Sequence, residues 1–488
     1  MTTTTEHQDR DPQQPYQGLY NPLVAHSARL LDPTRAVAVA DETFDTTLYV
    51  MNRLLLRLLP TDARVNAFIA FAAERGILIT PDETNARLHR EVIEAGLEQA
   101  AADWWVTPVE LSLLPGRVQE LNCWSLLQAW RASRTAADPD RTLVGLDHLM
   151  YANITGQTMT LGGTMTLGGT MTLGGTMTLG GTMTLGGGVS TQYAVAGLGG
   201  RMPVAWTGAA PARRKKVPFR RPVVAVLDTG VGQHPWLADG VQVVPPPPDA
   251  QPERTGVVHD QLEGTLDDFS GHGTFIAGLI RQGCPDADIY AVRVMGADGF
   301  VEESSMVNAL TQLWLRHARE PFLDVVNMSF GYYHEAPDDL RTDASLLGPL
   351  QALARRGVRL VASAGNDSTN RPMFPAAFSE RMDLVSVGAR NPNGTIALFS
   401  NSGTWVKAYA LGAAVISTQP TTFDASLQPS ARTGFDGHDR ESLDPDDFTG
   451  GFASWSGTSF AAPVVAARLA RAIIDEQRTA GEPPKPTS

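Results

Sequence analysis

The chain has 488 residues, more than one ordinary domain needs, so two or three domains are expected. It carries 39 Lys and Arg against 52 Asp and Glu, a formal net charge of -13, which gives no general basic character for binding nucleic acid. Its two cysteines, Cys123 and Cys284, lie far apart in the sequence. No disulfide framework is implied, and a reducing compartment is acceptable.

Residues 1–44 form a polar N-terminal arm that we expect to be partly disordered. The segment from Met1 to Tyr20 has no apolar core of the kind that marks a secretory signal. No later apolar run is long enough to cross a bilayer. These features predict a cytoplasmic protein with no membrane partner.

Residues 45–153 show the pattern of a small α+β domain. Apolar runs predict strands at 48–59, 77–79, 106–113 and 142–150, and helices are expected between Asp62 and Gly76 and over 117–132. A polar, helical insertion is expected over 82–102. Pro108 favours an edge position for its strand, and His148 is expected at the surface. The order strand, helix, strand, strand, helix, strand is the split βαβ, or ferredoxin-like, arrangement.

A linker is expected over residues 154–216. It contains Thr-Met-Thr-Leu-Gly-Gly five times in succession, from Thr158 to Gly187. Alternation of Met and Leu with Thr suits a strand, and the paired glycines suit a turn. Three readings stay open: a low-complexity linker, a tether that is cut, and a segment that stacks on other copies and makes the chain oligomerise.

A local basic segment, Arg213 to Lys216 together with Arg220 and Arg221, follows the repeat. A solvated linker is the simplest interpretation of it. The sharper alternative is a cleavage segment for maturation, because exposed linkers are where nicking occurs.

Four blocks in the last half of the chain carry catalytic residue types. The stretch 457–463 opens directly into an apolar helix, so Ser459 is either a helix cap or a nucleophile placed at the positive end of a helix. The apolar run 223–227 ends at Asp228, His272 lies between two glycines, and the run 358–364 ends at Gly365 and Asn366. Together they supply an orienting carboxylate, a general base, a nucleophile and an oxyanion donor.

With these blocks in this order, the stretch from about residue 217 to about residue 476 resembles the subtilisin-like serine proteases, or subtilases, of peptidase family S8. The blocks 327–331, 385–389 and 399–403 match the family as well. Phe275 and Leu411 depart from it, at positions that do not touch the chemistry. The resemblance implies an α/β, three-layer catalytic domain with a mostly parallel sheet over 217–478, followed by a polar tail over 479–488.

The resemblance also implies residue roles. Ser459 would attack the peptide carbonyl, His272 would move the proton, Asp228 would orient His272, and Asn366 would donate to the oxyanion together with the Ser459 backbone. An extended peptide or protein substrate would lie along Ser329, Phe330 and Gly331, with the pocket lined by Ala362, Ser363, Ala364 and Gly365. No cofactor is needed for catalysis. Acidic residues between Thr418 and Gly457 would either hold a structural calcium, as many subtilases do, or line a solvated loop.

Subtilase propeptides share the split βαβ fold and this place in the chain, and they act as folding chaperones and inhibitors. The resemblance therefore implies that residues 45–153 are an intramolecular inhibitor, with an unrelated binding domain as the alternative. The sequence predicts a serine endopeptidase made as an autoinhibited zymogen. Alternatives are a self-assembling protein driven by the repeat, with the protease as a regulated stress or defence effector, and a pseudoprotease that only binds.

Overall fold

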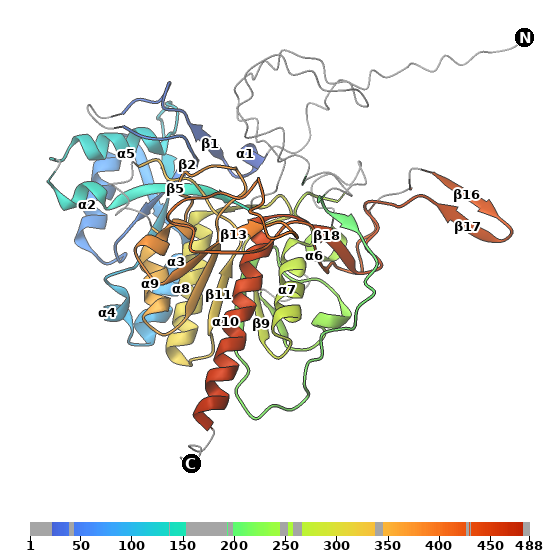
Figure 1. Cartoon of the computed structure of the whole chain (residues 1–488). Helices are drawn as coiled ribbons and strands as arrows, with labels where there is room; N and C mark the ends of the chain where they lie inside the picture. Colours follow the sequence, from blue (N-terminus) through green and yellow to red (C-terminus); the bar gives the residue numbers. More distant parts are fainter. Residues whose placement is uncertain are drawn as a thin grey trace, which may run out of the picture.

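The structure is a computed structural model that describes residues 22–38, 43–135, 137–152, 193, 199–244, 252–256, 266–336, 345–425, 429 and 431–481. The elements form an N-terminal α+β unit, drawn in blue and cyan, and a larger α/β unit that carries the rest (Figure 1). The five hexads from 158 to 187 lie outside the described residues, so their expected role stays a prediction.

The N-terminal sheet has the ferredoxin-like strand order that the sequence predicts. The strands β5, β2, β4 and β3 are neighbours in that order and pair antiparallel. Their bounds are β2 (Thr47–Leu56), β3 (Ile77–Pro81), β4 (Thr107–Leu113) and β5 (Val144–Tyr151). The helices α2 (Ala63–Ala73) and α5 (Cys123–Ala132) pack on one face of this sheet.

Apolar residues on both faces of β2 explain its continuous run of leucines. Leu54 and Leu56 pack with α2 and α5, whereas Leu55 points to the other face and joins the core of the larger unit. The first turn of α2 is capped by Asp62, whose side chain accepts from the Arg64 N–H at 2.9 Å. Pattern and cap therefore predicted this part of the unit correctly.

Three details of the N-terminal unit differ from the sequence prediction. Pro108 does not mark an edge, because β4 lies between β2 and β3; its carbonyl accepts from the Asp82 N–H at 3.0 Å, so it lies opposite the point where β3 has just ended. The helix predicted from residue 117 begins only at Cys123, where the Asn122 side chain accepts from the Trp124 N–H at 3.0 Å. His148 is 2% exposed, so the expectation of a surface histidine is wrong.

Further elements surround this sheet. The expected helical insertion is present as α3 (Glu83–Glu94) and α4 (Glu98–Ala101). Within the stretch assigned to the polar arm, α1 (Pro22–Ala25) and β1 (Ala28–Leu31) are formed, and β1 pairs with β2. Structure therefore begins earlier than the expected boundary at residue 45.

The larger unit is built on a seven-stranded sheet in the order β14-β13-β12-β11-β7-β9-β8, and every neighbouring pair is parallel. Its strands are β7 (Val223–Asp228), β8 (Val241–Val244), β9 (Asp288–Arg293), β11 (Val325–Met328), β12 (Arg359–Ser363), β13 (Leu384–Arg390) and β14 (Ala408–Leu411).

Helices cover both faces of this sheet. Val224 and Val226 of β7 pack with α7 (His272–Gly283) and α10 (Thr458–Gly481). Ala225 and Leu227 face the opposite way, toward α8 (Glu303–Arg319) and α9 (Leu347–Ala354). This alternation produces the three-layer α/β architecture that the resemblance implied.

Smaller elements complete the description. A three-stranded antiparallel sheet joins β6 (Met202–Pro203), β18 (Phe452–Trp455) and β15 (Val415–Thr418). The strands β16 (Arg432–Phe435) and β17 (His438–Glu441) form an exposed hairpin that reaches away from the body (Figure 1). The short helices are η1 (Pro139–Thr142), η3 (Pro235–Leu237), α6 (Pro252–Thr255) and η5 (Ala376–Glu380). Among the helices described, none combines the length and apolarity of a membrane span.

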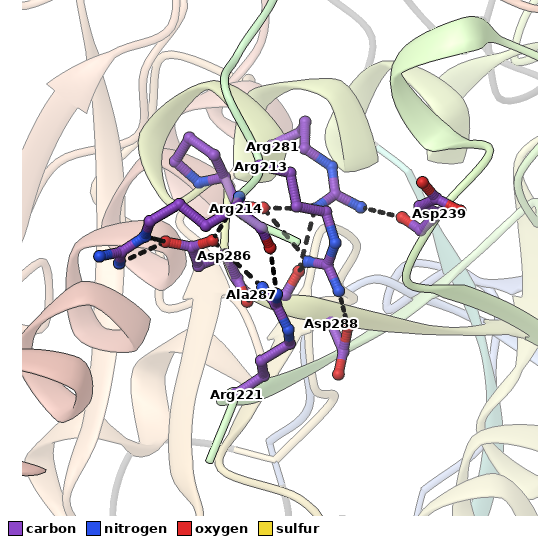
Figure 2. A network of polar contacts seen from close by, with 9 residues as sticks. Arg213, Arg214, Arg221, Asp239, Arg281, Asp286, Ala287 and Asp288 are labelled. Carbon is purple, nitrogen blue, oxygen red and sulfur yellow. Dashed lines mark hydrogen bonds and ion pairs between the residues drawn. The ribbon is translucent and has the colours of Figure 1, made fainter. Parts of the chain in front are cut away.

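The basic segment is exposed at Arg214, Lys215 and Lys216, as a solvated linker would be, but arginine contacts also anchor it to the larger unit. Arg214 donates to the Asp286 carboxylate from its backbone N–H at 3.0 Å and from Nε at 2.7 Å. Arg221 donates to the same carboxylate at 3.1 Å, and Arg213 donates to the Ala287 carbonyl at 2.7 Å. Figure 2 shows these arginines converging on the turn before β9.

Candidate active site

Asp228 and His272 meet where the last residue of β7 faces the first residue of α7. His272 Nδ1 lies 2.8 Å from Asp228 Oδ1, and the two residues are 1% and 0% exposed. A side chain at Gly273 would collide with the Gly230 carbonyl, so a glycine after His272 permits this close approach.

The contact with Asp228 fixes which nitrogen of His272 carries a proton. Because the carboxylate accepts, Nδ1 donates and Nε2 is left as the basic nitrogen. Nε2 has no hydrogen-bond partner among the described residues. The imidazole can therefore take a proton at that atom.

Ser459 is the second residue of α10 and is fully buried. Its hydroxyl donates to the Ser329 carbonyl at 3.1 Å, and the Ser329 hydroxyl donates to the Ser459 carbonyl at 2.9 Å. The second bond is possible because Pro463, four residues on, has no N–H to donate to that carbonyl. The proline thus leaves an acceptor that ties α10 to the segment after β11.

Asn366 follows β12, and its carboxamide has a defined orientation. Its Oδ1 accepts from both the backbone N–H and the hydroxyl of Thr458, each at 2.8 Å. The Nδ2 group is therefore the side of the amide that can donate elsewhere, next to the start of α10.

The predicted substrate residues fall into two groups. Gly331 exchanges two backbone hydrogen bonds with Tyr151, donating at 3.0 Å and accepting at 2.9 Å, so it pairs with an extended strand. Phe330 has its side chain fully buried in the core around α8 and α9, so any pairing with an extended substrate at this residue would use its backbone.

The predicted pocket residues lie on β12 and just after it. Ala362, Ser363 and Ala364 are fully buried, and Ser363 Oγ has no hydrogen-bond partner in the described part of the chain. Gly365 has a φ of 102°, which a glycine adopts without strain, and its N–H donates to the Thr458 hydroxyl at 3.1 Å. These residues contact the same turn that carries Ser459.

Sequence reasoning missed two acidic residues beside this site. Asp367 is exposed and accepts from the Tyr333 hydroxyl at 2.6 Å. Glu253 lies next to Asp228 and His272 and is 1% exposed. Asp367 follows Asn366 directly and could have been noticed, whereas no motif surrounds Glu253.

Comparisons with known proteins agree with this arrangement. A model of the subtilase family matches residues 220–481. Subtilisin BL of Lederbergia lenta is 34% identical over 215 residues, which cover 42% of this chain and 68% of that protein. An alkaline protease of Alkalihalobacillus alcalophilus is 33% identical over 215 residues, covering 42% and 48%. A solved lanthipeptide protease aligns at 23% identity with a TM-score of 0.38, covering 54% of this chain and 76% of that one.

The family model spans more than half of the chain and includes all four chemical residues, Asp228, His272, Asn366 and Ser459. The Lederbergia and Alkalihalobacillus relatives are, by name, a subtilisin and an alkaline protease. The chain therefore belongs to the subtilase family.

Proposed function

We propose that this subtilase is a serine endopeptidase whose intact chain is held inactive by its own N-terminal unit. The observation that carries the catalytic part is the buried contact of 2.8 Å between His272 Nδ1 and Asp228 Oδ1. In this proposal Ser459 Oγ attacks the peptide carbonyl while His272 Nε2 takes its proton and then passes it to the leaving amine. Asp228 keeps the imidazole oriented and stabilises its charged form.

In the structure the Ser459 hydroxyl donates to the Ser329 carbonyl, and His272 Nε2 has no hydrogen-bond partner among the described residues. The hydroxyl must therefore redirect its proton to His272 before it attacks. The negative oxygen that forms on the substrate would then receive hydrogen bonds from Asn366 Nδ2 and the Ser459 N–H. These steps move only protons and electron pairs of side chains and substrate, so the proposal includes no cofactor.

Backbone pairing supports the inhibitory role of the N-terminal unit. β5 lies antiparallel to β10 (Phe300–Glu302) of the larger unit, with Tyr151 opposite Phe300. At its end Tyr151 also pairs with Gly331, and the Ala152 N–H donates to the Gly299 carbonyl at 2.8 Å. The end of β5 thus lies between two backbone segments in the position proposed for an extended substrate.

Side-chain contacts with α8 also hold the N-terminal unit against the larger unit. Trp104, which follows α4, packs edge-on against Trp314 of α8 with ring centroids 4.7 Å apart. Asn308 of α8 donates to Asp82 at 3.0 Å. The proposed inhibitor therefore rests on a packed, partly apolar contact as well as on strand pairing.

The test is the intact mass of the purified wild type over time beside Ser459→Ala. We expect only the wild type to be cut, between Ala152 and the anchored Arg213, and only the wild type to be labelled by a fluorophosphonate probe. Labelling of Ser459→Ala to the same extent would refute the role of this serine. A labelled wild type that stays whole would refute processing of the N-terminal unit.

Assembly through the repeat is kept as a second proposal because the hexads carry no charge. Its test is the size of Ser459→Ala in solution, with and without residues 158–187. A monomer with the repeat intact would count against this function. The expected structural calcium likewise stays a proposal.

A further inference from the structure

A buried glutamate contacts both sides of the Asp228–His272 pair. Glu253 lies in the short helix α6, and its Oε1 accepts from the Gly271 N–H at 3.1 Å and lies 2.5 Å from Thr229 Oγ1. Its Oε2 accepts from the Thr274 hydroxyl. These partners come directly before His272, directly after Asp228, and from the first turn of α7.

The hydroxyl protons around Glu253 can be placed. Thr274 Oγ1 accepts from the Gly232 N–H at 2.8 Å, so its own proton goes to Glu253. Thr229 Oγ1 accepts from the Gly273 N–H at 3.0 Å and has two carboxylate neighbours, Glu253 at 2.5 Å and Asp228 at 3.3 Å. A hydroxyl has one proton, so Thr229 can donate to only one of them.

The protonation state of Glu253 therefore decides which of the two carboxylates accepts the hydroxyl proton of Thr229. When Glu253 is ionised, the nearer Oε1 takes the Thr229 proton, and Asp228 loses that donor. When Glu253 carries a proton on Oε1, that proton points to Thr229 Oγ1, and Thr229 can donate to Asp228. The carboxylate that orients His272 gains or loses a hydrogen bond in step with Glu253.

We propose that Glu253 is a positioning residue whose proton, relayed through Thr229 and Asp228, sets the pH at which His272 becomes a working base. The inference rests on the proposed catalytic roles of Asp228 and His272. An ionised Glu253 places a second negative charge beside the Asp228–His272 pair, and it leaves Asp228 with one hydrogen-bond donor fewer. Both effects favour the protonated imidazole of His272. A neutral Glu253 does the reverse.

Glu253 can change its charge in the range where a histidine base works. Burial raises the pKa of its carboxyl to about 7; the hydrogen bonds from Thr229 and Thr274 oppose this, and the charge of Asp228 adds to it. Besides Asp228 and His272, two arginines of the described residues lie near it: Arg201, whose guanidinium donates to the Ser270 carbonyl, and Arg293, whose side chain approaches Gly230 as that of Glu253 does.

The experiment compares the full-length wild type with Glu253→Gln, which keeps the shape and removes the charge. The rate at which a fluorophosphonate probe labels Ser459 is measured from about pH 5 to about pH 9, because labelling needs a neutral His272. We expect the acid midpoint of the profile to fall by about one pH unit in Glu253→Gln, with the plateau rate within a few-fold. An unchanged midpoint would overturn the inference.

Glu380→Gln is the matched control. Glu380 also accepts from a threonine hydroxyl, Thr404 Oγ1 at 2.8 Å, but it is exposed and far from Asp228 in the chain. Its profile should coincide with that of the wild type. A wild type that is neither cut nor labelled at any pH would sink the proposed function itself, whereas labelling with coincident profiles for Glu253→Gln and wild type would sink only the role of Glu253.

A second measurement needs no variant at position 253. The Nδ1 proton of His272, followed by NMR in the wild type, should shift in two steps as pH changes, one from the imidazole and one from Glu253. A single step across the same range would contradict the relay, even if Glu253→Gln failed to fold.

Discussion

At the scale of single residues, Asn366 has two separable roles. Its Oδ1 accepts two hydrogen bonds from Thr458, and its Nδ2 is the proposed oxyanion donor. Asn366→Ala removes both roles and leaves the buried Thr458 N–H without an acceptor. Asn366→Asp keeps an acceptor for Thr458 but removes the donor.

We expect both variants to lose about a hundred- to a thousandfold in rate, as is typical when one oxyanion donor is removed. The rate of self-cleavage, followed by intact mass, measures this loss. Asn366→Asp should unfold closer to the wild-type temperature than Asn366→Ala, because it keeps the contact with Thr458. Self-cleavage of Asn366→Ala at the wild-type rate would contradict the assignment.

The residues that carry chemistry differ in how visible they are in the sequence. Asp228, His272, Asn366 and Ser459 each lie where an apolar run begins or ends, so motif and pattern coincide. Glu253 and His148 act through partners that are close only after folding. Glu253 reaches Thr229 and Thr274, and His148 reaches Glu303, more than 150 residues away. No local spacing could have revealed these contacts.

At the scale of elements, the basic segment is the clearest case in which context overrides composition. Four adjacent cationic residues suggest solvent exposure, and Arg214, Lys215 and Lys216 are exposed, but Arg214 and Arg221 also donate to Asp286, whose side chain is 10% exposed. The acceptor lies on the turn before β9 (Figure 2), about 70 residues away in the sequence. Pairing over that distance cannot be predicted from charge alone.

This network predicts that Asp286→Ala frees the segment from Arg213 to Lys216. Removal of the shared carboxylate should lower the free energy of unfolding by about 1–3 kcal/mol, since charged hydrogen bonds are lost. In a Ser459→Ala background, trypsin should cut the freed segment several times faster, which intact mass would show. Asp239→Ala is the control, because Arg281 contacts only the backbone carbonyl of Asp239 (Figure 2). Equal trypsin sensitivity of the two variants would show that the network does not anchor the segment.

Element types and order were largely predictable, whereas element ends and neighbours were not. The alternation around Leu55 and the Asp62 cap are local signals, and the strand and helix that they predict are present. Pro108 was misjudged because strand order depends on packing of the whole sheet. The late start of α5 depends on Asn122, whose side chain also accepts from the Tyr49 hydroxyl at 3.1 Å.

At the scale of the whole molecule, two histidines of the N-terminal unit are each held between two carboxylates of the larger unit. His26 contacts Glu302 at 2.8 Å and Asp298 at 2.9 Å. His148 contacts Glu303 at 2.6 Å and Glu335 at 2.7 Å, again through both ring nitrogens. A histidine that donates from both nitrogens carries a positive charge.

The surroundings of the two histidines favour that charge. Burial opposes it in both cases, but the paired carboxylates outweigh burial and raise the pKa of His26 to about 9 and that of His148 to about 10. The ring of His148 also stacks on that of Tyr332, with centroids 4.4 Å apart, and its centroid lies 4.9 Å from that of His334. Arg131 Nη2 lies 4.0 Å from Glu335 Oε1, the oxygen that does not contact His148. The interface between the two units therefore favours the positively charged form of both histidines.

The direction in which stability changes with pH follows from the raised pKa values of the two histidines. In an undocked N-terminal unit both histidines would titrate near their ordinary value of about 6.5. Docking therefore takes up protons between about pH 6.5 and the higher docked values. The stabilisation from the two histidines is fully present below about pH 6.5 and is lost as pH rises through about 9 and about 10.

We predict that the full chain, as Ser459→Ala, loses stability between about pH 7 and about pH 10 more steeply than the same chain with His26→Gln and His148→Gln. Urea unfolding at several pH values gives both curves, and titrating groups away from the two histidines and their carboxylate partners cancel in the difference. The double variant should be less stable at neutral pH, since buried carboxylates lose their partners, but its pH dependence should be flatter. His438→Gln, on the exposed strand β17, should follow the parent curve. Parallel curves of stability against pH for the parent and the double variant would mean that the histidines do not hold the two units together as cations. Proton uptake would then play no part in keeping the proposed inhibitor on the enzyme.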